Sequence, residues 1–333
     1  MRVLVALSGG VDSSVAAWRL VKEGHEVGGV FLKLMQGDGS GCCNLRSAEA
    51  ARAVATELGI PFFALDYADA FQKGVIEPAL KGLREGMTPS PCADCNGVVK
   101  FGALLEQARR MGVEQLATGH YARREEGKSG VELHEAANTK KDQTWFLWST
   151  PKPALEKILF PLGRDISKGD VRQEAARVGL PTAETPESQD LCFAPQGITA
   201  LLEENEGEVL DLEGLVVGKH RGQHTVTLGQ RRGLGVALGQ PVYAVGKNAQ
   251  KNTVTVGPYG AGARNEVPLT SVNLISRCRG GGLEARIRHR GKRHKVEEFD
   301  GTTVRFTQPI VVAPGQSVVI YKGTRVVGGG CAG

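Results

Sequence analysis

The residues Ser8-Gly9-Gly10-Val11-Asp12-Ser13-Ser14 give the strongest chemical signal in the sequence. They follow an apolar stretch, residues 3–7, that predicts a strand, and precede residues 15–22, which predict a helix. Two adjacent glycines let the backbone approach an anion closely, and the N-terminus of a helix favours negative charge. Ser13 and Ser14 can add hydroxyl donors. The segment therefore predicts a phosphate-binding loop, although it lacks the Gly-Lys-Ser/Thr ending of a Walker loop.

Three cysteines give the second signal. Cys92 and Cys95 form a CxxC just before a predicted helix, residues 98–111, and Cys192 lies far along the chain. Thiols at a helix N-terminus have lowered pKa values, so we expect them to be nucleophilic at neutral pH. Three interpretations stay open: a structural zinc site, three corners of a [4Fe–4S] cluster with one open iron, or a nucleophile and persulfide carrier at Cys95 and Cys192 with Cys92 as accessory.

The remaining cysteines favour no disulfide framework. The chain has seven, an odd number, and its apolar start is only a strand long, so we expect neither a secretory signal nor a membrane span and place the protein in the cytoplasm. Cys42 and Cys43 are interpreted as loop thiols, and Cys278 and Cys331 as bystanders in the β-rich region.

Basic residues are concentrated late in the chain. Between Arg277 and Lys295, eight Lys or Arg side chains and one acid give a local net charge of +7 within a total of +5, so the remaining chain is −2. Arg286, Arg288 and Arg290 alternate with other residues, which predicts that in a strand their three guanidinium groups share one face. Such a patch favours contact with a nucleic-acid backbone, with a solvated strand as the alternative.

The elements that must position these residues follow two patterns. Up to about residue 205, short apolar strands alternate with helices, which predicts an α/β domain with a parallel sheet and a ligand site at the carboxyl ends of its strands. Afterwards short β-rich runs, including 225–228, alternate with glycines, and residues 257–268 are the expected linker. We therefore predict an α/β domain over 1–205 and two small β-rich domains, a central one over 206–265 and a C-terminal one over 266–333.

Together these residues resemble the bacterial tRNA-specific 2-thiouridylases, which use a PP-loop of the type SGGxDSS to transfer AMP to an oxygen. The likeness spans nearly the whole chain. The matching segments are Ser8–Ser14, Cys95-Asn96 with Lys100-Phe101, Thr118-Gly119-His120-Tyr121, Lys141-Asp142-Gln143 with Phe146-Leu147, Cys192-Phe193, residues 227–235 and Pro314-Gly315-Gln316-Ser317.

The resemblance implies a fold, a reaction and roles for residues. The fold would be an adenine-nucleotide α-hydrolase-like PP-loop domain followed by two small β-rich domains, the last a β-barrel. The reaction would be ATP-dependent replacement of O2 by sulfur at the wobble uridine of tRNA. ATP would be held by Ala6, Leu7, Ser8, Gly9, Gly10, Val11, Asp12, Ser13, Leu32 and Gly119, with Mg²⁺ at Asp12 unless that residue only shapes the loop.

The resemblance also implies the sulfur and tRNA sites. Cys95 corresponds to the nucleophile and Cys192 to the persulfide cysteine, with a disulfide between them in the reaction cycle and a cysteine desulfurase or sulfur-relay protein as donor. The tRNA contacts would be Ser90, Pro91, Cys92, Lys141, Asp142, Gln143, Arg288 and His289.

Two positions depart from the family pattern. Cys92 stands where many members have an aspartate, which keeps a [4Fe–4S] cluster on Cys92, Cys95 and Cys192 open, and His289 stands where a tyrosine is typical. Two other functions are weighed: an adenylating ligase, which would leave the thiols unexplained, and a nonenzymatic RNA-binding protein, which would release no AMP.

Overall fold

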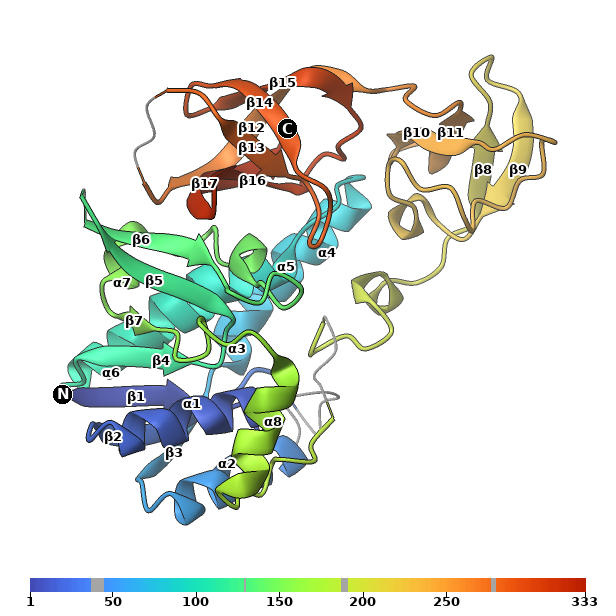
Figure 1. The fold of residues 1–333 in the computed structure, drawn as a ribbon. Helices are drawn as coiled ribbons and strands as arrows, with labels where there is room; N and C mark the ends of the chain where they lie inside the picture. Colours follow the sequence, from blue (N-terminus) through green and yellow to red (C-terminus); the bar gives the residue numbers. More distant parts are fainter. Residues whose placement is uncertain (37–44, 129, 187–190, 277–279) are drawn as a thin grey trace.

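The computed structural model describes residues 1–36, 45–128, 130–186, 191–276 and 280–333. Figure 1 shows an α/β part at the N-terminus, a β-barrel at the C-terminus and a smaller sheet connected between them along the chain. Some residues for which the sequence made predictions lie outside the described part of the chain: Cys42, Cys43, Arg277, Cys278 and Arg279.

The N-terminal part is built on a parallel sheet of order β3-β2-β1-β4-β7. Successive side chains of a strand point to opposite faces, and β1 shows this directly: Val3 and Val5 join one buried cluster and Leu4 joins another. The predicted parallel α/β fold is confirmed. The strands are β1 (Arg2–Ala6), β2 (Glu26–Lys33), β3 (Phe62–Asp66), β4 (Gln115–Thr118) and β7 (Ile158–Leu159).

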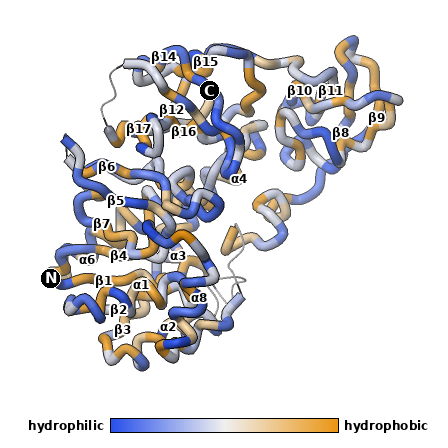
Figure 2. The backbone as a smooth tube through the Cα atoms, in the orientation of Figure 1, coloured by the Kyte–Doolittle hydropathy of each residue, from blue (hydrophilic) through white to orange (hydrophobic). Residues whose placement is uncertain are grey.

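Helices pack on both faces of this sheet. The helices α1 (Val11–Lys22), α2 (Leu45–Glu57) and α8 (Lys168–Arg177) share a buried cluster on one face. A π-helical stretch, Cys95–Leu104, and α6 (Leu105–Arg110) cover the other. Figure 2 shows the apolar colouring along β1 and β4 and hydrophilic stretches on α8, as a sheet covered on both faces requires. Shorter helices are α3 (Ala68–Phe71), α4 (Glu77–Arg84), α5 (Pro91–Asp94) and α7 (Lys152–Leu155).

The C-terminal sheet closes into a barrel because β12 pairs with both β15 and β17. This confirms the predicted β-barrel. Its strands are β12 (Arg264–Leu274), β13 (Leu283–Arg286), β14 (His294–Phe299), β15 (Thr303–Ile310), β16 (Ser317–Lys322) and β17 (Arg325–Ala332). A hairpin of the N-terminal part, β5 (Ala122–Gly127) and β6 (Gly130–Glu135), extends the sheet where His134 is opposite Arg325. The sequence analysis did not predict this hairpin.

The central part is a small sheet of order β10-β11-β8-β9. Its strands are β8 (Gly207–Leu210), β9 (Val216–His220), β10 (Tyr243–Asn248) and β11 (Thr253–Gly257). The strand predicted over 225–228 is wrong: the Thr225 hydroxyl donates to the carbonyl of Gly222, and the Gln230 side chain accepts from the amide of Thr227. Such local bonds compete with strand pairing.

The linker predicted over 257–268 is too long, because β12 begins at Arg264 and pairs there with β15. The domain boundaries after residues 205 and 265 stay predictions.

Candidate active site

A cavity of about 320 Å³ lies at the carboxyl ends of β1, β2 and β4, as predicted for a parallel sheet. Both chemical signals of the sequence meet in it. Of the predicted ATP residues, Ala6, Leu7, Ser8, Asp12, Ser13, Leu32 and Gly119 line the cavity, while Gly9, Gly10 and Val11 belong to the loop without lining it. Cys92, Cys95 and Cys192 line the same cavity.

The glycine loop is held in shape by its own serines. The hydroxyls of Ser13 and Ser14 donate to the carbonyl of Gly10 at 3.0 and 2.9 Å, and the amide of Ser8 donates to the Ser13 hydroxyl at 3.1 Å. Ser14 is fully buried, so its hydroxyl closes the loop. The expectation that this hydroxyl would be a donor to phosphate is therefore wrong. Gly9 has a positive φ of 77°, and a Cβ there would lie 2.4 Å from the carbonyl oxygen of Ser47.

The end of β4 packs directly on this loop. A Cβ at Gly119 would lie 2.7 Å from the amide nitrogen of Ser13, closer than real Cβ contacts come. Only glycine fits there without moving the backbone. The segment after β4 therefore forms one wall of the predicted nucleotide site.

Asp12 is the acidic residue of the loop, and two side chains hold its carboxylate. The Tyr121 hydroxyl donates to Oδ1 at 2.8 Å, and the ammonium of Lys168, the first residue of α8, forms an ion pair with the same oxygen. Ser167 begins this helix by accepting a hydrogen bond from the amide of Gly169. The sequence analysis missed Lys168, and the cap signal of Ser167 locates only the helix start.

The cysteines come from three different local structures. Cys92 lies in the short helix α5, Cys95 begins the π-helical stretch and is 6% exposed, and Cys192 is half-buried beyond α8. The residues just before Cys192, 187–190, lie outside the described part of the chain. The CxxC pair and a third cysteine far along the chain thus line one cavity.

The electrostatics of Cys95 differ from the expectation. Burial raises the pKa of its thiol to about 11; the nearby Lys100 opposes this rise, and Cys192 and Asp94 add to it. The lowered pKa predicted from a helix N-terminus is therefore wrong for this cysteine, because desolvation disfavours the thiolate more than the local charges favour it.

His120 also lines the cavity, with its ring near the rings of Phe101 and Phe160. Its Nδ1 lies 2.7 Å from the Thr118 hydroxyl, and burial lowers the pKa of the imidazole well below its ordinary value. The side chain is therefore neutral near pH 7, which suits a hydrogen-bonding role better than that of a proton donor.

Comparisons with known proteins agree with this arrangement. Family models described as the tRNA methyl transferase HUP domain, the tRNA methyl transferase PRC-barrel domain and the aminomethyltransferase beta-barrel domain match residues 1–196, 197–258 and 270–332. The chain is 44% identical to the tRNA-specific 2-thiouridylase MnmA of Thermus thermophilus, over 98% of this chain and 94% of that protein. The chain belongs to the tRNA-specific 2-thiouridylase family.

Other relatives are similar over the same extent. The 2-thiouridylase MnmA of Acidiphilium cryptum is 42% identical over 99% of both chains. Among solved structures, the U34-tRNA thiolase NcsA of Methanococcus maripaludis with its [4Fe-4S] cluster is 19% identical, covers 60% of this chain and 65% of that chain, and has a TM-score of 0.38.

The loop that leads to Cys92 is fixed by both later parts of the chain. The side-chain amide of Gln223, from the central part, donates to the carbonyls of Leu83 and Arg84 at the end of α4. The carbonyl of Pro314, from the barrel, accepts a hydrogen bond from the amide of Thr88 at 2.7 Å. The matching segment 314–317 thus holds Thr88, while Gln223 holds the end of α4.

Part of the predicted tRNA contact set reaches the cavity. Lys141, Gln143 and His289 line it, and Arg290 and Phe146, which we had not assigned, line it as well. The rings of Phe146 and His289 lie 4.4 Å apart, while Trp145 and Trp148 are buried. The predicted contacts Ser90, Pro91, Asp142 and Arg288 do not line the cavity.

The predicted basic strand is corrected in two ways. β13 ends at Arg286, and Arg290 adopts a left-handed backbone, so Arg286, Arg288 and Arg290 do not share one strand face. Arg286 forms ion pairs with Glu135 and Asp142, and the Asp142 side chain is only 2% exposed. The turn after β13 breaks the alternation that the sequence suggested, and part of the basic patch is neutralised within the fold.

The described residues hold no group of three or more His, Cys, Asp or Glu side chains arranged to bind a metal ion. In the same part of the chain, every helix is too short or too polar to cross a membrane.

Proposed function

We propose that this chain is an ATP-dependent tRNA-uridine 2-sulfurtransferase that converts the wobble uridine of tRNA, position 34, to 2-thiouridine. One observation carries the proposal: the glycine loop and the thiols of Cys92, Cys95 and Cys192 line the same cavity. The names of the relatives, tRNA-specific 2-thiouridylases that cover nearly the whole chain, support the same reaction.

The chemistry explains why an ATP loop and thiols belong in one cavity. The O2 of uracil is part of a conjugated urea-like system, so sulfur cannot displace it directly. O2 first attacks the α-phosphorus of ATP, the bond to pyrophosphate breaks, and the attached AMP becomes a leaving group. The loop and the two helix N-termini near Asp12 supply the positive potential that stabilises the departing pyrophosphate.

We assign ATP to the residues Ala6–Ser13, Leu32 and Gly119, largely through backbone groups. Asp12 fits a Mg²⁺ ion that arrives with ATP, because Mg²⁺ in such sites needs one or two carboxylates besides phosphate oxygens and water. Its side chain is 34% exposed, although Oδ1 already accepts bonds from Tyr121 and Lys168. The ion would neutralise charge on the phosphates.

The thiols complete the reaction with a persulfide. The terminal sulfur on Cys192 attacks C2, and AMP leaves with the former O2. The thiolate of Cys95 then attacks the Sγ of Cys192: the S–S bond breaks, its electron pair stays on the transferred sulfur, and a Cys95–Cys192 disulfide forms. In a variant order, Cys95 releases hydrosulfide first. A thiol reductant restores the cysteines, and a cysteine desulfurase or sulfur-relay protein reloads Cys192.

A [4Fe–4S] cluster would need Cys92, Cys95 and Cys192 as its ligands. The donor type is right, but the described side chains are not arranged as a metal-binding group. The residues thus do not fit a cluster in this conformation, and no step is assigned to one.

The tRNA side of the proposal uses both walls of the cavity. Cys92 would face the target base, with Ser90 and the buried Pro91 holding it in place. Lys141 and Gln143 would contact tRNA from the α/β part, and Arg288 and His289 would contact it from the barrel. Asp142 is buried and would act only through its neighbours. The uridine must leave its stack to expose C2, as for any enzyme that acts on a base. Residues 1–205 would catalyse, and the parts over 206–265 and 266–333 would bind tRNA.

The test is nucleoside mass spectrometry of wobble-uridine tRNA incubated anaerobically with the protein, Mg-ATP and a sulfur donor. We expect 2-thiouridine only when ATP is present, with AMP released. Bound tRNA without 2-thiouridine or AMP, with donor and ATP verified, would favour a nonenzymatic RNA-binding protein. Iron and acid-labile sulfide in the active protein, with activity lost on chelation, would contradict the persulfide route.

A further inference from the structure

The turn between β13 and β14 carries barrel residues into the active-site cavity. It spans residues 287–293, and His289 and Arg290 in its middle line the cavity. An arginine stands at each end of this turn: Arg286 is the last residue of β13, and Arg293 lies just before β14. The contacts of these two arginines therefore decide where the turn lies.

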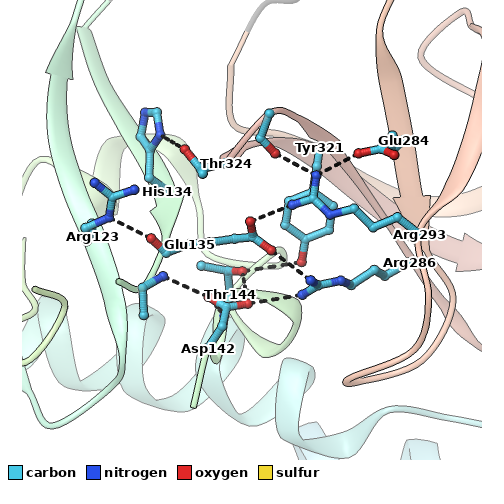
Figure 3. Close-up of polar contacts among 12 residues, drawn as sticks. Arg123, His134, Glu135, Asp142, Thr144, Glu284, Arg286, Arg293, Tyr321 and Thr324 are labelled. Carbon is cyan, nitrogen blue, oxygen red and sulfur yellow. Dashed lines mark hydrogen bonds and ion pairs between the residues drawn. The ribbon is translucent and has the colours of Figure 1, made fainter. Parts of the chain in front are cut away.

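Both arginines bind one carboxylate of the α/β part, at Glu135, the last residue of β6 (Figure 3). Arg286 Nη2 lies 3.0 Å from Oε1, and Arg293 Nη2 lies 2.6 Å from Oε2. The Glu135 side chain is 7% exposed, and both guanidinium groups lie over the ring of Tyr321. Each end of the turn is thus attached to the same buried acid.

The second acid of the cluster, Asp142, holds the cavity-lining residues 141–143. Its Oδ2 accepts a hydrogen bond from the Thr144 hydroxyl at 2.8 Å and lies 3.4 Å from Arg286 Nη1, and its Oδ1 accepts from the amide of Ala136. The residues on either side of it, Lys141 and Gln143, line the cavity. One cluster thus joins two segments that line the cavity, residues 141–143 and the turn 287–293.

This geometry gives the cluster a function beyond stability. Buried ion pairs are weak evidence for stability, but they impose a specific arrangement because a misplaced partner leaves a buried charge unpaired. We propose that Glu135, Asp142, Arg286 and Arg293 form an interdomain positioning cluster that sets the tRNA-facing wall 141–143 against the turn 287–293. The proposal rests on the proposed function, since it concerns where the target uridine is held.

The proposal is tested with Arg286→Met and Arg293→Met, and with Arg305→Met as the matched control. Arg305 lies in the same barrel and also pairs with two glutamates, but its side chain is 46% exposed and it does not line the cavity. We expect the two cluster variants to lower kcat for thiolation at least tenfold and to leave ATP affinity unchanged. The salt dependence of tRNA binding should stay that of the wild type, because a guanidinium already paired with carboxylates holds no counterion to release. The control should retain wild-type kinetics.

Hydrogen exchange supplies a readout that needs no activity. In Arg286→Met, amide exchange should rise together in residues 287–293 and 137–143, and in the control it should not. If Arg286→Met does not fold, Arg286→Lys and Glu135→Gln replace it. Both substitutions roughly keep the side-chain volume and lose only part of the Arg286–Glu135 contact. In the double variant Glu135→Gln/Arg286→Lys, kcat should fall by a smaller factor than the product of the factors measured for the two single variants.

Three results would overturn the proposal. If the slope of log tRNA affinity against log salt concentration falls by about one in Arg286→Met, Arg286 contacts a phosphate directly. Wild-type kcat in folded variants would remove the positioning role, and exchange confined to the barrel would show that the two walls are not coupled. Failure of the proposed function is distinguishable, because the wild type itself would then make no 2-thiouridine while the exchange experiment still reports on the cluster.

Discussion

The ammonium of Lys168 forms an ion pair with the carboxylate of Asp12, and so joins the N-terminus of α8 to that of α1. A lysine at the first position of a helix is unfavourable, because the helix dipole repels a cation there. The Lys168 side chain is nevertheless only 13% exposed. Its position next to the glycine loop is therefore explained by the carboxylate of Asp12, which lines the nucleotide cavity.

Replacement of Lys168 by methionine should weaken ATP binding by about ten- to hundredfold, since a hydrogen bond to a charged group contributes roughly 1.5–3 kcal/mol. Tertiary structure should persist, because Met keeps most of the buried stem. Calorimetric titration with a nonhydrolysable ATP analogue measures the change. Lys22→Met, at the exposed far end of α1, is the control and should bind ATP normally. ATP affinity within twofold of the wild type in Lys168→Met would exclude the role.

A single methyl group at Gly119 should also damage the nucleotide site. The added Cβ would meet the backbone of Asp12 and Ser13 at less than 3 Å, so the loop must shift. We expect Gly119→Ala to lose ATP binding at least tenfold while tRNA affinity stays near that of the wild type. Gly281→Ala, where a Cβ meets nothing within 4 Å, is the matched control. Equal ATP affinity in both variants would show that residue 119 does not shape the site.

The glycine loop and the cysteines could be predicted because each signal is local. A strand, two glycines and a helix occur in one short run of residues, and the parallel sheet then directs its strand ends to one edge. The Asp12–Lys168 pair could not be predicted this way, since its partners are 156 positions apart. A helix start at Ser167 is visible in the sequence, but which residue that helix end meets depends on the packing of α8 against α1.

The basic stretch shows a second reason why the sequence alone did not predict the surroundings of a side chain. Charge count and alternation indicated a surface strand, but the turn after Arg286 and the two buried acids Glu135 and Asp142 give its arginines different environments. Whether an arginine faces solvent or a buried carboxylate is decided by another part of the chain. The likeness to the 2-thiouridylases located the segment, and only the packing separated its exposed cations from its paired ones.

Two cysteines should be required for sulfur transfer and dispensable for ATP binding. Cys192→Ser removes the persulfide carrier and Cys95→Ser the resolving thiol, so neither variant should form 2-thiouridine, while both should bind ATP as the wild type does. Cys331→Ser is the control, because this cysteine lies on β17 and does not line the cavity. Nucleoside mass spectrometry measures the product. Thiolation retained in Cys192→Ser would remove this residue from the mechanism.

Burial of Cys95 should make its alkylation steeply pH-dependent. With a pKa of about 11, the thiolate fraction is small at neutral pH and rises about tenfold per pH unit up to that value. Peptide mapping after iodoacetamide treatment of metal-free protein should show this slope between pH 8 and 10. In denatured protein, where a cysteine has its ordinary pKa near 8.5, the rate should level off above about pH 9. A flat rate from pH 7 to 9 in the folded protein would contradict the burial argument.

Arg288, an exposed arginine of the β13–β14 turn, should act differently from the partly buried Arg286. Arg288 is exposed and donates to the carbonyl of Leu228 at 3.3 Å, which orients it between the barrel and the central part. If it contacts a phosphate, Arg288→Ala should weaken tRNA binding and lower the slope of log affinity against log salt by about one. Filter binding over a salt series measures this, with the exposed Arg305→Ala as control. An unchanged slope in Arg288→Ala would exclude the phosphate contact. A lowered slope in Arg288→Ala, together with the unchanged slope expected for Arg286→Met, would show that Arg288 binds tRNA whereas Arg286 positions the turn.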